Sequence, residues 1–384
     1  MKGTVEFRSK LPNVGTTIFT VMSALANKHK AINLSQGFPN FDCSPRLKGL
    51  VTKYMEMGYN QYPPMTGVLG LREEIARKVE GMYGANVNPD TEVTVVAGAT
   101  QGLFTAISAF IRPGDEVVLI EPAYDSYRPS IEVCGGVPVI YELKAPNYKI
   151  NWDQLAQLFS PKTKMIIINT PHNPTGTSLK EEDLRALQAV TAGTNILVLS
   201  DEVYEHLIYD GKAHQSVLRF PDLFQRSLAV YSFGKTFHNT GWKIGYVIAP
   251  DYLTVEFRKV HQFNVFTVNT PMQYALADFL KDPKEYLQLP EFYQQKRDYF
   301  SKILEQSRFK PIQSEGTYFQ LAAYGHLSQE PDTEFAKRMT IDHGVAVIPV
   351  SVFYSGGRDD KVIRFCFAKT EELLANAGKS LVKI

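Results

Sequence analysis

The sequence has few cysteines, no long apolar run and no excess of charge of either sign. Among 384 residues only Cys43, Cys134 and Cys366 are cysteines, and their scatter shows neither a disulfide framework nor metal-ligand spacing. No apolar run approaches the length that spans a membrane, and Met1–Thr17 is too polar for the core of a signal peptide. Net charge is +1, which favours neither nucleic acid nor an anionic membrane as a partner. We therefore expect a cytoplasmic protein without a bound metal.

The apolar residues predict an α/β fold. Hydrophobic residues make up 44% of the chain, and a chain of 384 residues favours two domains. From residue 92 onward, short apolar runs alternate with helical stretches, which is typical of a mostly parallel sheet covered by helices on both faces. The expected strands are Val93–Ala97, Val117–Ile120, Val137–Leu143, Met165–Ile168, Ile196–Leu199 and Leu228–Tyr231. The expected helices before residue 200 are Ile18–His29, Arg46–Met57, Val68–Tyr83, Gln101–Ile111, Trp152–Phe159 and Lys180–Val190.

The pattern changes after Thr270, where helices precede a second, smaller set of strands. The helices expected there are Gln273–Leu280, Leu287–Gln306 and Thr333–Asp342, and the strands are Tyr318–Ala322, Val345–Pro349 and Val362–Phe367. This pattern predicts a smaller α+β unit. We expect residues 1–45 to form an arm that completes the small domain, residues 46–285 the large domain, and residues 286–384 the small domain.

A lysine follows the last strand expected in the large domain. Ser232-Phe233-Gly234-Lys235 ends the apolar run Leu228–Tyr231, so Lys235 is expected at the exit of a buried strand. Open α/β sheets bind ligands at that edge. A lysine there can lose its proton and form a Schiff base with an aldehyde cofactor, although a lone lysine in a loop is more often simply solvated.

Polar side chains follow two other expected strands. Asp201 follows the expected strand Ile196–Leu199; a carboxylate there can cap a helix or bind a metal, or it can pair with a pyridinium nitrogen and keep it protonated. Tyr204 is close enough in sequence to share that site, or is a core tyrosine. Asn173 lies in a Pro/Gly-rich segment, which is either a plain turn or the source of an amide that donates to a phenolic oxygen.

Phosphate-binding groups are expected at the same edge. Gly98-Ala99-Thr100 opens a helix after a strand, so its backbone N–H groups can bind a phosphate. Lys243 can supply a counter-charge and Ser232 a hydroxyl.

Two further residues suit an amino-acid substrate and a flat ring. Arg364 alternates with apolar residues in an expected strand; it either lies on the surface or captures an α-carboxylate with its planar fork. Tyr124 follows another strand and either packs in the core or stacks on a ring.

Together these segments resemble fold-type I, class I/II pyridoxal-phosphate aminotransferases along essentially the whole chain. The matching segments are Ser232–Lys235, Gly241–Tyr246, Asn173–Gly176, Asp201–Tyr204 and the late Arg364. The resemblance implies a large domain with a mostly parallel seven-stranded sheet between helices, a smaller α+β domain, and pyridoxal 5′-phosphate as cofactor.

The resemblance also implies a role for each residue. Lys235 is the catalytic lysine, Asp201 pairs with the ring nitrogen, and Arg364 binds the substrate carboxylate. The other cofactor-binding residues it implies are Asn173 and Tyr204 at the ring oxygen, Tyr124 stacked on the ring, and Gly98, Ala99, Thr100, Ser232 and Lys243 at the phosphate. The family often has arginine in place of Lys243; lysine keeps the charge but not the bidentate grip.

A closer resemblance is to the group of bacterial methionine aminotransferases, which is related to kynurenine aminotransferase and glutamine transaminase K. It is carried by Gly15–Phe19, Asn33–Pro39, Asn60–Tyr62 and Ile348–Tyr354. It implies donors with bulky, soft or aromatic side chains. The substrate-binding residues implied are Phe19, Gly37, Phe38, Asn173 and Arg364, and nothing acidic or basic near Phe19 or Phe38 in the sequence suggests a second charge clamp. It further implies a homodimer in which Tyr62 reaches the neighbouring active site.

Two alternatives remain open from the sequence. One is a kynurenine–oxoglutarate or glutamine transaminase with cysteine-S-conjugate β-lyase activity, because the same carbanion can expel a β-leaving group. The other is a non-catalytic pyridoxal-phosphate sensor domain of a transcription regulator. We expect neither the attached DNA-binding domain nor the basic stretch that such a regulator usually needs.

Overall fold

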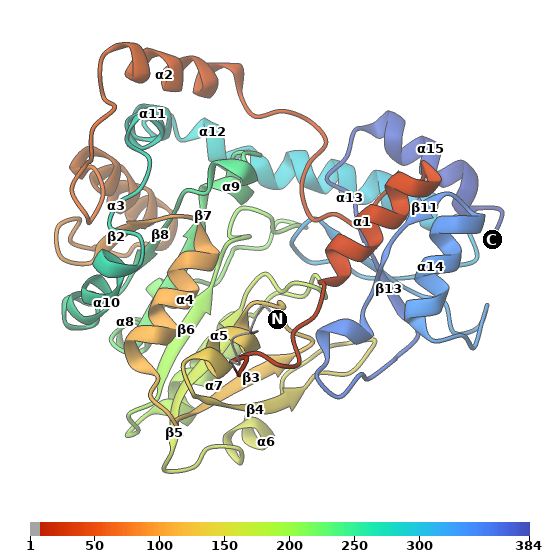
Figure 1. Cartoon of the computed structure of the whole chain (residues 1–384), viewed down its shortest axis with the longest axis horizontal. Coiled ribbons are helices and arrows are strands. Elements are labelled where there is room, and N and C mark those ends of the chain that lie inside the picture. The colour runs from red at the N-terminus through yellow and green to blue at the C-terminus, as the bar shows by residue number, and fades with distance from the viewer. Residues whose placement is uncertain (1–7) are drawn as a thin grey trace, which may run out of the picture.

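The computed structural model describes residues 8–384, so residues 1–7 of the predicted arm lie outside it. The described chain has three sheets: a large one of seven strands, a small one of four strands and a two-stranded one (Figure 1). The strands of the large sheet are β2 (Val93–Val96), β3 (Glu116–Glu121), β4 (Val137–Glu142), β5 (Thr163–Asn169), β6 (Leu197–Asp201), β7 (Ser227–Ser232) and β8 (Gly245–Ile248). The predicted seven-stranded, mostly parallel sheet is confirmed.

Strand β8, for which the apolar pattern predicted no range, explains why the sheet is only mostly parallel. The strand order is β2-β8-β7-β6-β5-β3-β4, and β8 runs antiparallel to both of its neighbours. The carboxyl ends of the other six strands therefore share one edge with the amino end of β8. This arrangement brings the residues just before β8 to the ligand-binding edge.

Helices cover both faces of the large sheet because alternate side chains of each strand point to opposite faces. In β3, Val118 and Ile120 pack into one apolar core while Val117 and Leu119 pack into another. The helices over the first core are α2 (Pro45–Glu56), α3 (Leu69–Tyr83), α6 (Trp152–Ala156), α7 (Glu181–Thr191), α8 (Pro221–Phe224) and α11 (Thr270–Leu280). Those over the second core are α4 (Ala99–Phe110), α5 (Tyr127–Val133) and α10 (Asp251–Asn264), while the short α9 (Phe233–Thr236) follows β7.

The small sheet has the order β12-β13-β10-β9 and its own apolar core. Its strands are β9 (Lys310–Ile312), β10 (Phe319–Ala323), β12 (Ile348–Pro349) and β13 (Val362–Cys366). The helices near it are α1 (Ile18–His29), α12 (Lys284–Leu287), α13 (Leu289–Glu305), α14 (Asp332–Asp342) and α15 (Glu371–Leu381). The predicted single strand Val345–Pro349 is in fact two, because β11 (Val345–Ala346) pairs with β1 (Ile32–Asn33) and only β12 pairs with β13.

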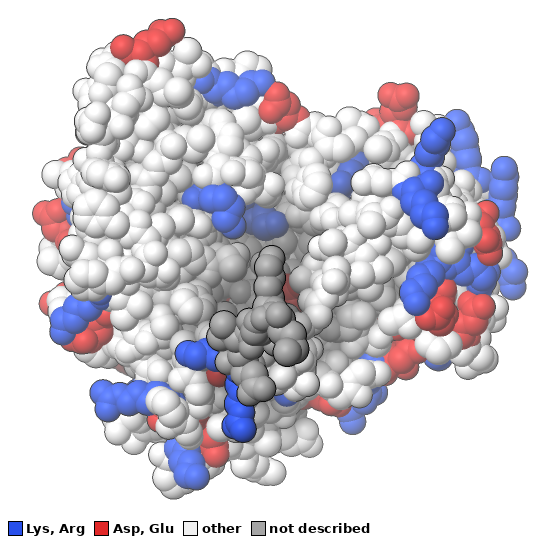
Figure 2. Space-filling view, viewed as in Figure 1, with Lys and Arg blue, Asp and Glu red and all other residues white. Residues whose placement is uncertain are grey.

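The N-terminal segment packs with the C-terminal one. Helix α1 begins after Thr17, whose side chain accepts a hydrogen bond from the backbone N–H of Thr20, and it packs against α14. Figure 1 shows α1 beside α14 and α15, on the side of the molecule away from β4 and β5. Figure 2 shows a hollow between the two lobes, with basic side chains inside it. Within residues 8–384, no helix has the length and apolar character needed to cross a membrane.

Candidate active site

One cavity, with a volume of about 160 Å³, lies at the edge where the carboxyl ends of six large-sheet strands meet. Asp201 ends β6, Ser232 ends β7, and Gly98 follows β2. The cavity is lined by ten of the residues proposed from sequence: Gly98, Ala99, Thr100, Tyr124, Asn173, Asp201, Tyr204, Ser232, Lys235 and Lys243. Segments up to about 145 residues apart in the chain therefore contribute to one site.

The Lys235 amine is buried and held by two oxygens. It lies in α9, and its Nζ donates to the hydroxyl of Tyr318 at 2.8 Å and to the carbonyl of Gly37 at 3.2 Å. Burial, with a smaller contribution from the nearby Arg364 guanidinium, lowers the pKa of Lys235 to about 8. An amine with this pKa has a substantial neutral fraction near pH 8 and can act as a nucleophile or a base.

The carboxylate of Asp201 is fixed by two donors. The hydroxyl of Tyr127 donates to Oδ2 at 2.6 Å and the backbone N–H of Val203 donates to Oδ1 at 3.3 Å. Burial raises the pKa of Asp201 to about 6, while the Tyr127 hydrogen bond opposes that rise. A cationic ring nitrogen beside this carboxylate would lower its pKa, since an opposite charge favours the ionised form.

The start of α4 forms a cradle for an anion. Gly98 precedes the helix with φ +78°, and the helix has no side-chain cap, so its first backbone N–H groups face the cavity. A Cβ at Gly98 would lie 3.2 Å from Nζ of Lys243, so glycine leaves the room in which that amine approaches the helix terminus. The cradle of N–H groups, a lysine and the hydroxyls of Thr100 and Ser232 fits a phosphate.

Arg364 is 1% exposed, so the alternative that it lies on the surface is wrong. β13 lies between β12 and β10 in the small sheet, and all five of its residues are buried, so both faces of this strand are covered. Nη1 of Arg364 donates to Oδ1 of Asn173 at 2.7 Å, and Nη2 donates to the carbonyl of Ser35 at 3.3 Å. Burial lowers its pKa to about 10, which leaves the guanidinium charged at neutral pH.

Aromatic rings surround the Arg364 guanidinium. Its Cζ lies 3.8 Å from the ring centroid of Phe319, 5.4 Å from that of Phe19 and 5.3 Å from that of Phe353. These rings fix the guanidinium plane by cation–π contact. Within the described residues, Nε of Arg364 has no hydrogen-bond partner, so the guanidinium retains capacity for a carboxylate.

Five of the predicted substrate or cofactor residues are not part of the cavity lining: Phe19, Gly37, Phe38, Tyr62 and Arg364. Gly37 and Arg364 still bond to lining residues, Lys235 and Asn173 respectively. Tyr62 is 80% exposed and its ring packs against Phe266 at 5.2 Å. Phe38 is 45% exposed, and Phe19 is partly buried against Phe353. The fold places Nζ of Lys369 5.2 Å from the ring centroid of Phe38, a cation that the residues next to Phe38 in the sequence do not indicate.

Sequence reasoning missed Tyr127, Tyr318 and Asn169. The first two contact Asp201 and Lys235 directly, and no local pattern separates them from other core tyrosines. Asn169 lies behind Asn173: its Oδ1 accepts the Asn173 backbone N–H at 2.7 Å and its amide donates to the Asp201 carbonyl at 2.9 Å. A signal for Asn169 was present, since it is the polar residue that ends an apolar strand.

Comparison with known proteins decides the family. The chain matches Aminotransferase class I and II over residues 29–381. It belongs to this family. Enzymes of the family use pyridoxal phosphate and act on amino acids and 2-oxo acids.

Several relatives match along nearly the whole chain. Methionine aminotransferase of Escherichia coli (strain K12) is 50% identical over 375 residues, which are 97% of each chain. Kynurenine–oxoglutarate transaminase of Dictyostelium discoideum is 35% identical, covering 96% of this chain and 94% of its own. A solved Escherichia coli structure, reported to identify a methionine aminotransferase function, has a TM-score of 0.98 and 49% identity over 99% of this chain and 100% of that one. N-succinyldiaminopimelate aminotransferase of Mycobacterium tuberculosis has a TM-score of 0.94 and 35% identity over 98% and 100% of the two chains.

Proposed function

We propose that this aminotransferase moves the amino group of methionine, or of an aromatic or glutamine-like amino acid, to a 2-oxo acid by a ping-pong mechanism. The observation that carries the proposal is the single cavity shared by a buried amine, a buried carboxylate and a cradle for a phosphate. The 50% identity to a methionine aminotransferase supports the choice of donor.

The residues of the cavity suit pyridoxal phosphate. We assign Asp201 to the ring nitrogen, Tyr124 to the ring face, and Asn173 and Tyr204 to the ring oxygen. Oδ1 of Asn173 accepts from Arg364, which leaves the Asn173 amide group to donate. The phosphate is assigned to Gly98, Ala99, Thr100, Ser232 and Lys243. When bound, the cofactor supplies an electron-withdrawing ring that accepts the electron pair released at the substrate Cα.

Lys235 binds the cofactor and then moves the proton. Its buried amine, with a pKa of about 8, is neutral often enough to take the Cα proton and return it to the cofactor carbon. The hydroxyl of Tyr318 and the carbonyl of Gly37 orient the amine. Arg364 holds the substrate α-carboxylate and so turns the Cα–H bond toward Lys235.

The walls around Arg364 favour a bulky or soft substrate side chain. The ring centroids of Phe19 and Phe353 lie 6.0 Å apart beside the guanidinium. Phe38 has a partly exposed ring. Lys369, the cation beside Phe38, already donates to the carbonyls of Gln36 and Phe38. An apolar pocket of this kind discriminates modestly between similar side chains, so we expect several donors to react.

A panel of donors tests the proposed function. In single half-reactions the conversion of bound pyridoxal phosphate to its amine form is followed by absorbance. We expect methionine, phenylalanine and glutamine to react faster than aspartate. Lys235→Ala should abolish the conversion. The control is Lys281→Ala, which changes an exposed lysine at the end of α11 and should leave the conversion unchanged. Absence of conversion with every donor, or turnover retained by Lys235→Ala, would refute the proposal.

Kynurenine and cysteine conjugates form the second candidate set of substrates. Relatives named kynurenine–oxoglutarate transaminase align along most of the chain at 33–35% identity. In the same panel, a higher rate for kynurenine than for methionine, or release of pyruvate from a cysteine conjugate without an oxo acid, would favour this alternative.

We also propose a cytoplasmic homodimer with a large domain at residues 46–285 and a small domain at 286–384 completed by the arm 1–45. Free thiols at Cys43, Cys134 and Cys366 suit a reducing compartment. Exposed rings of Tyr62, Phe263 and Phe266 suit an interface between two copies. Two sheets of separate strand order support the domain division.

A further inference from the structure

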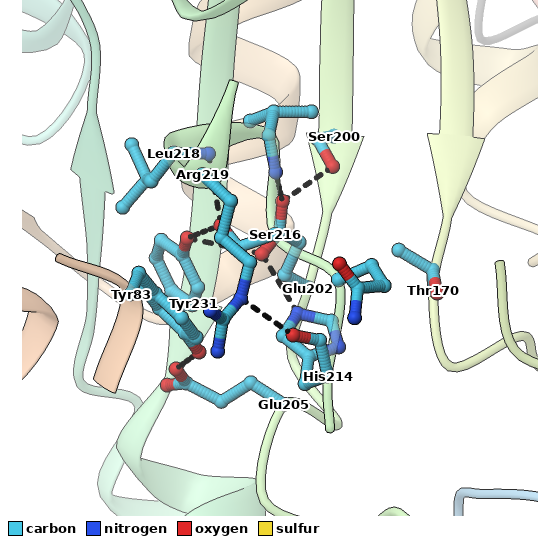
Figure 3. Close-up of polar contacts among 12 residues, drawn as sticks. Tyr83, Thr170, Ser200, Glu202, Glu205, His214, Ser216, Leu218, Arg219 and Tyr231 are labelled. Atoms are coloured by element: carbon cyan, nitrogen blue, oxygen red, sulfur yellow. Dashed lines mark hydrogen bonds and ion pairs between the residues drawn. The ribbon is translucent and has the colours of Figure 1, made fainter. Parts of the chain in front are cut away.

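A second carboxylate lies one residue after Asp201, on the other face of the large sheet. Side chains of a strand alternate between faces, so Glu202 shares its face with Ser200 while Asp201 lines the cavity. Glu202 is 0% exposed. Figure 3 shows its carboxylate between the side chains of Ser200, Tyr231 and His214.

Four donors surround Glu202. Its Oε1 accepts from the hydroxyl of Ser200 at 2.8 Å and from the backbone N–H of Val217 at 3.1 Å. Its Oε2 accepts from the hydroxyl of Tyr231 at 3.0 Å and from Nε2 of His214 at 2.9 Å. An ionised carboxylate accepts about four hydrogen bonds in total, so these donors satisfy the charged form.

The charge of Glu202 differs from that of its neighbour Glu205 in one respect. Lys78 neutralises Glu205 at 2.6 Å, with both side chains 2% exposed. Across residues 8–384, Glu202 forms an ion-pair contact only with His214. His214 donates from Nε2, and its buried Nδ1 has no hydrogen-bond partner in the described chain, which suits a neutral ring with its proton on Nε2. Glu202 is thus a buried carboxylate with no lysine or arginine within ion-pair distance in residues 8–384, although Lys78, the partner of Glu205, is near enough for its charge to interact with that of Glu202.

We propose that Glu202 is a positioning residue that fixes Asp201 from behind and adds a negative charge to its surroundings, so that a cofactor ring nitrogen facing Asp201 keeps its proton. The inference rests on the proposed function, in which Asp201 pairs with that nitrogen. The backbone N–H of Glu202 donates to the carbonyl of Val230 at 2.9 Å, so its anchored side chain and its strand pairing hold the same backbone that carries Asp201.

The negative charge of Glu202 acts on Asp201 and the ring nitrogen together. Two groups that share a proton titrate together, and a nearby negative charge raises the proton affinity of both. Glu202 already raises the pKa of Asp201, although less than burial does. With one proton retained by the pair, the ring stays electron-poor and stabilises the charge released at Cα.

Glu202→Gln tests the proposal on the enzyme loaded with pyridoxal phosphate. Glutamine keeps the shape: with its oxygen in place of Oε1 it still accepts from Ser200 and the Val217 N–H, and its NH2 in place of Oε2 can donate to the hydroxyl of Tyr231 and to Nε2 of His214 in the other tautomer. The visible absorbance of the lysine-bound cofactor changes with pH as its C=N nitrogen loses a proton, and a negative charge buried next to Asp201 raises the midpoint of that change as well. We expect the midpoint to fall by about 0.5 to 1 pH unit, the size of a charge effect across a partly screened interior. The half-reaction rate with methionine should fall about threefold to tenfold without a change in methionine affinity.

Two control variants separate charge from structure. Tyr231→Phe removes one donor to Glu202 but leaves the charge, so its midpoint should equal that of the wild type. Asp332→Asn removes a different buried carboxylate, at the start of α14, which accepts a hydrogen bond from the backbone N–H of Ser351. This variant should also leave the midpoint unchanged. An unshifted Glu202→Gln midpoint, or a shift of equal size in Tyr231→Phe, overturns the inference.

A third variant covers the case in which Glu202→Gln does not fold. His214→Lys places a fixed positive charge beside Glu202 and should lower the midpoint in the same direction. An unshifted midpoint there overturns the inference as well. Failure of the wild type to form the cofactor absorbance would instead refute the proposed function, so the two failures are distinguishable.

Discussion

At the scale of single residues, burial determines the chemistry of the site. The same desolvation lowers the pKa of Lys235 and raises that of Asp201, which brings both within a few units of neutrality. Strained backbone is not needed for this effect. Tyr318 and Tyr127 orient these two groups, and the hydrogen bond from Tyr127 also favours the charged form of Asp201.

The pKa of Lys235 predicts how apoenzyme takes up its cofactor. Only the neutral amine attacks the aldehyde, so its rate of reconstitution with pyridoxal phosphate should rise about tenfold per pH unit below pH 8 and level off above it. The lysine is protonated below its lowered pKa, which gives the rise its sign. Stopped-flow absorbance measures the rate. A rate that continues to rise to pH 10 would show that the amine keeps an ordinary pKa.

Arg364→Lys should weaken amino-acid binding without displacing the cofactor. Lysine keeps the positive charge but not the planar fork, and it loses the contacts with the ring of Phe319. We expect methionine affinity to fall about 10-fold to 100-fold, the effect of losing one charge-assisted hydrogen bond. Cofactor titration and half-reaction kinetics give the two affinities. An equal loss of cofactor affinity and methionine affinity would mean that the substitution distorts the whole cavity.

At the scale of elements, the site depends on how the large sheet is connected. Strand β8 enters antiparallel between β2 and β7, and this places Lys243 beside the start of α4. Gly245 must be small there, because a Cβ would lie 2.5 Å from the carbonyl of Tyr231. The antiparallel direction of β8 therefore brings the cation of Lys243 to the start of α4, where we predict that the phosphate binds.

Gly98→Ala tests the cradle. Alanine at φ +78° is strained, and its Cβ would lie 3.1 Å from Cε of Lys243, so both folding and phosphate binding should suffer. We expect a loss of about 1–2 kcal/mol in the free energy of unfolding of the apoenzyme and about tenfold weaker cofactor binding. Gly114→Ala is the matched control, since Gly114 has φ +89° with nothing near its Cβ position. If both variants bind the cofactor equally well, the cradle is not where the phosphate lies.

At the scale of the whole molecule, the two lobes meet across the hollow seen in Figure 2. Arg364 from the small sheet bonds to Asn173 in the segment after β5 of the large sheet, so a predicted substrate-binding group and a predicted cofactor-binding group come from different lobes. Closure of the small lobe on the large one would therefore bring Arg364 and Lys235 to one substrate.

The exposed Tyr62 predicts that the active site is completed by a second copy of the chain. If Tyr62 reaches the partner's phosphate, Tyr62→Phe should weaken cofactor binding about tenfold by removing one hydrogen bond to a charged group. Mixed dimers of Tyr62→Phe with Lys235→Ala chains should contain one site that carries both defects and one that carries neither. Regained activity of the mixture, measured after co-refolding, supports the shared site. Tyr252→Phe, at another exposed tyrosine, is the control.

Much of the large domain was predictable because its signals are local. Buried parallel strands such as Ile166–Ile168 are continuous apolar runs, and polar residues at their ends, such as Asp201, mark the ligand edge. Strand β8 was not predicted, because a four-residue run next to a glycine and a lysine resembles a loop. The split of Val345–Pro349 escaped because pairing partners, rather than propensity, decide where a strand changes sheet.

The sequence by itself determined the family, the alternation of strands and helices, and which residues carry a lysine, an acid and an amide to the strand ends. Only the tertiary structure decided that Arg364 is buried, that Tyr318 and Tyr127 bond Lys235 and Asp201, and that Lys369 lies against Phe38. The reason is physical: hydrophobic periodicity is a local property of the chain, whereas these contacts join residues that lie tens to hundreds of positions apart.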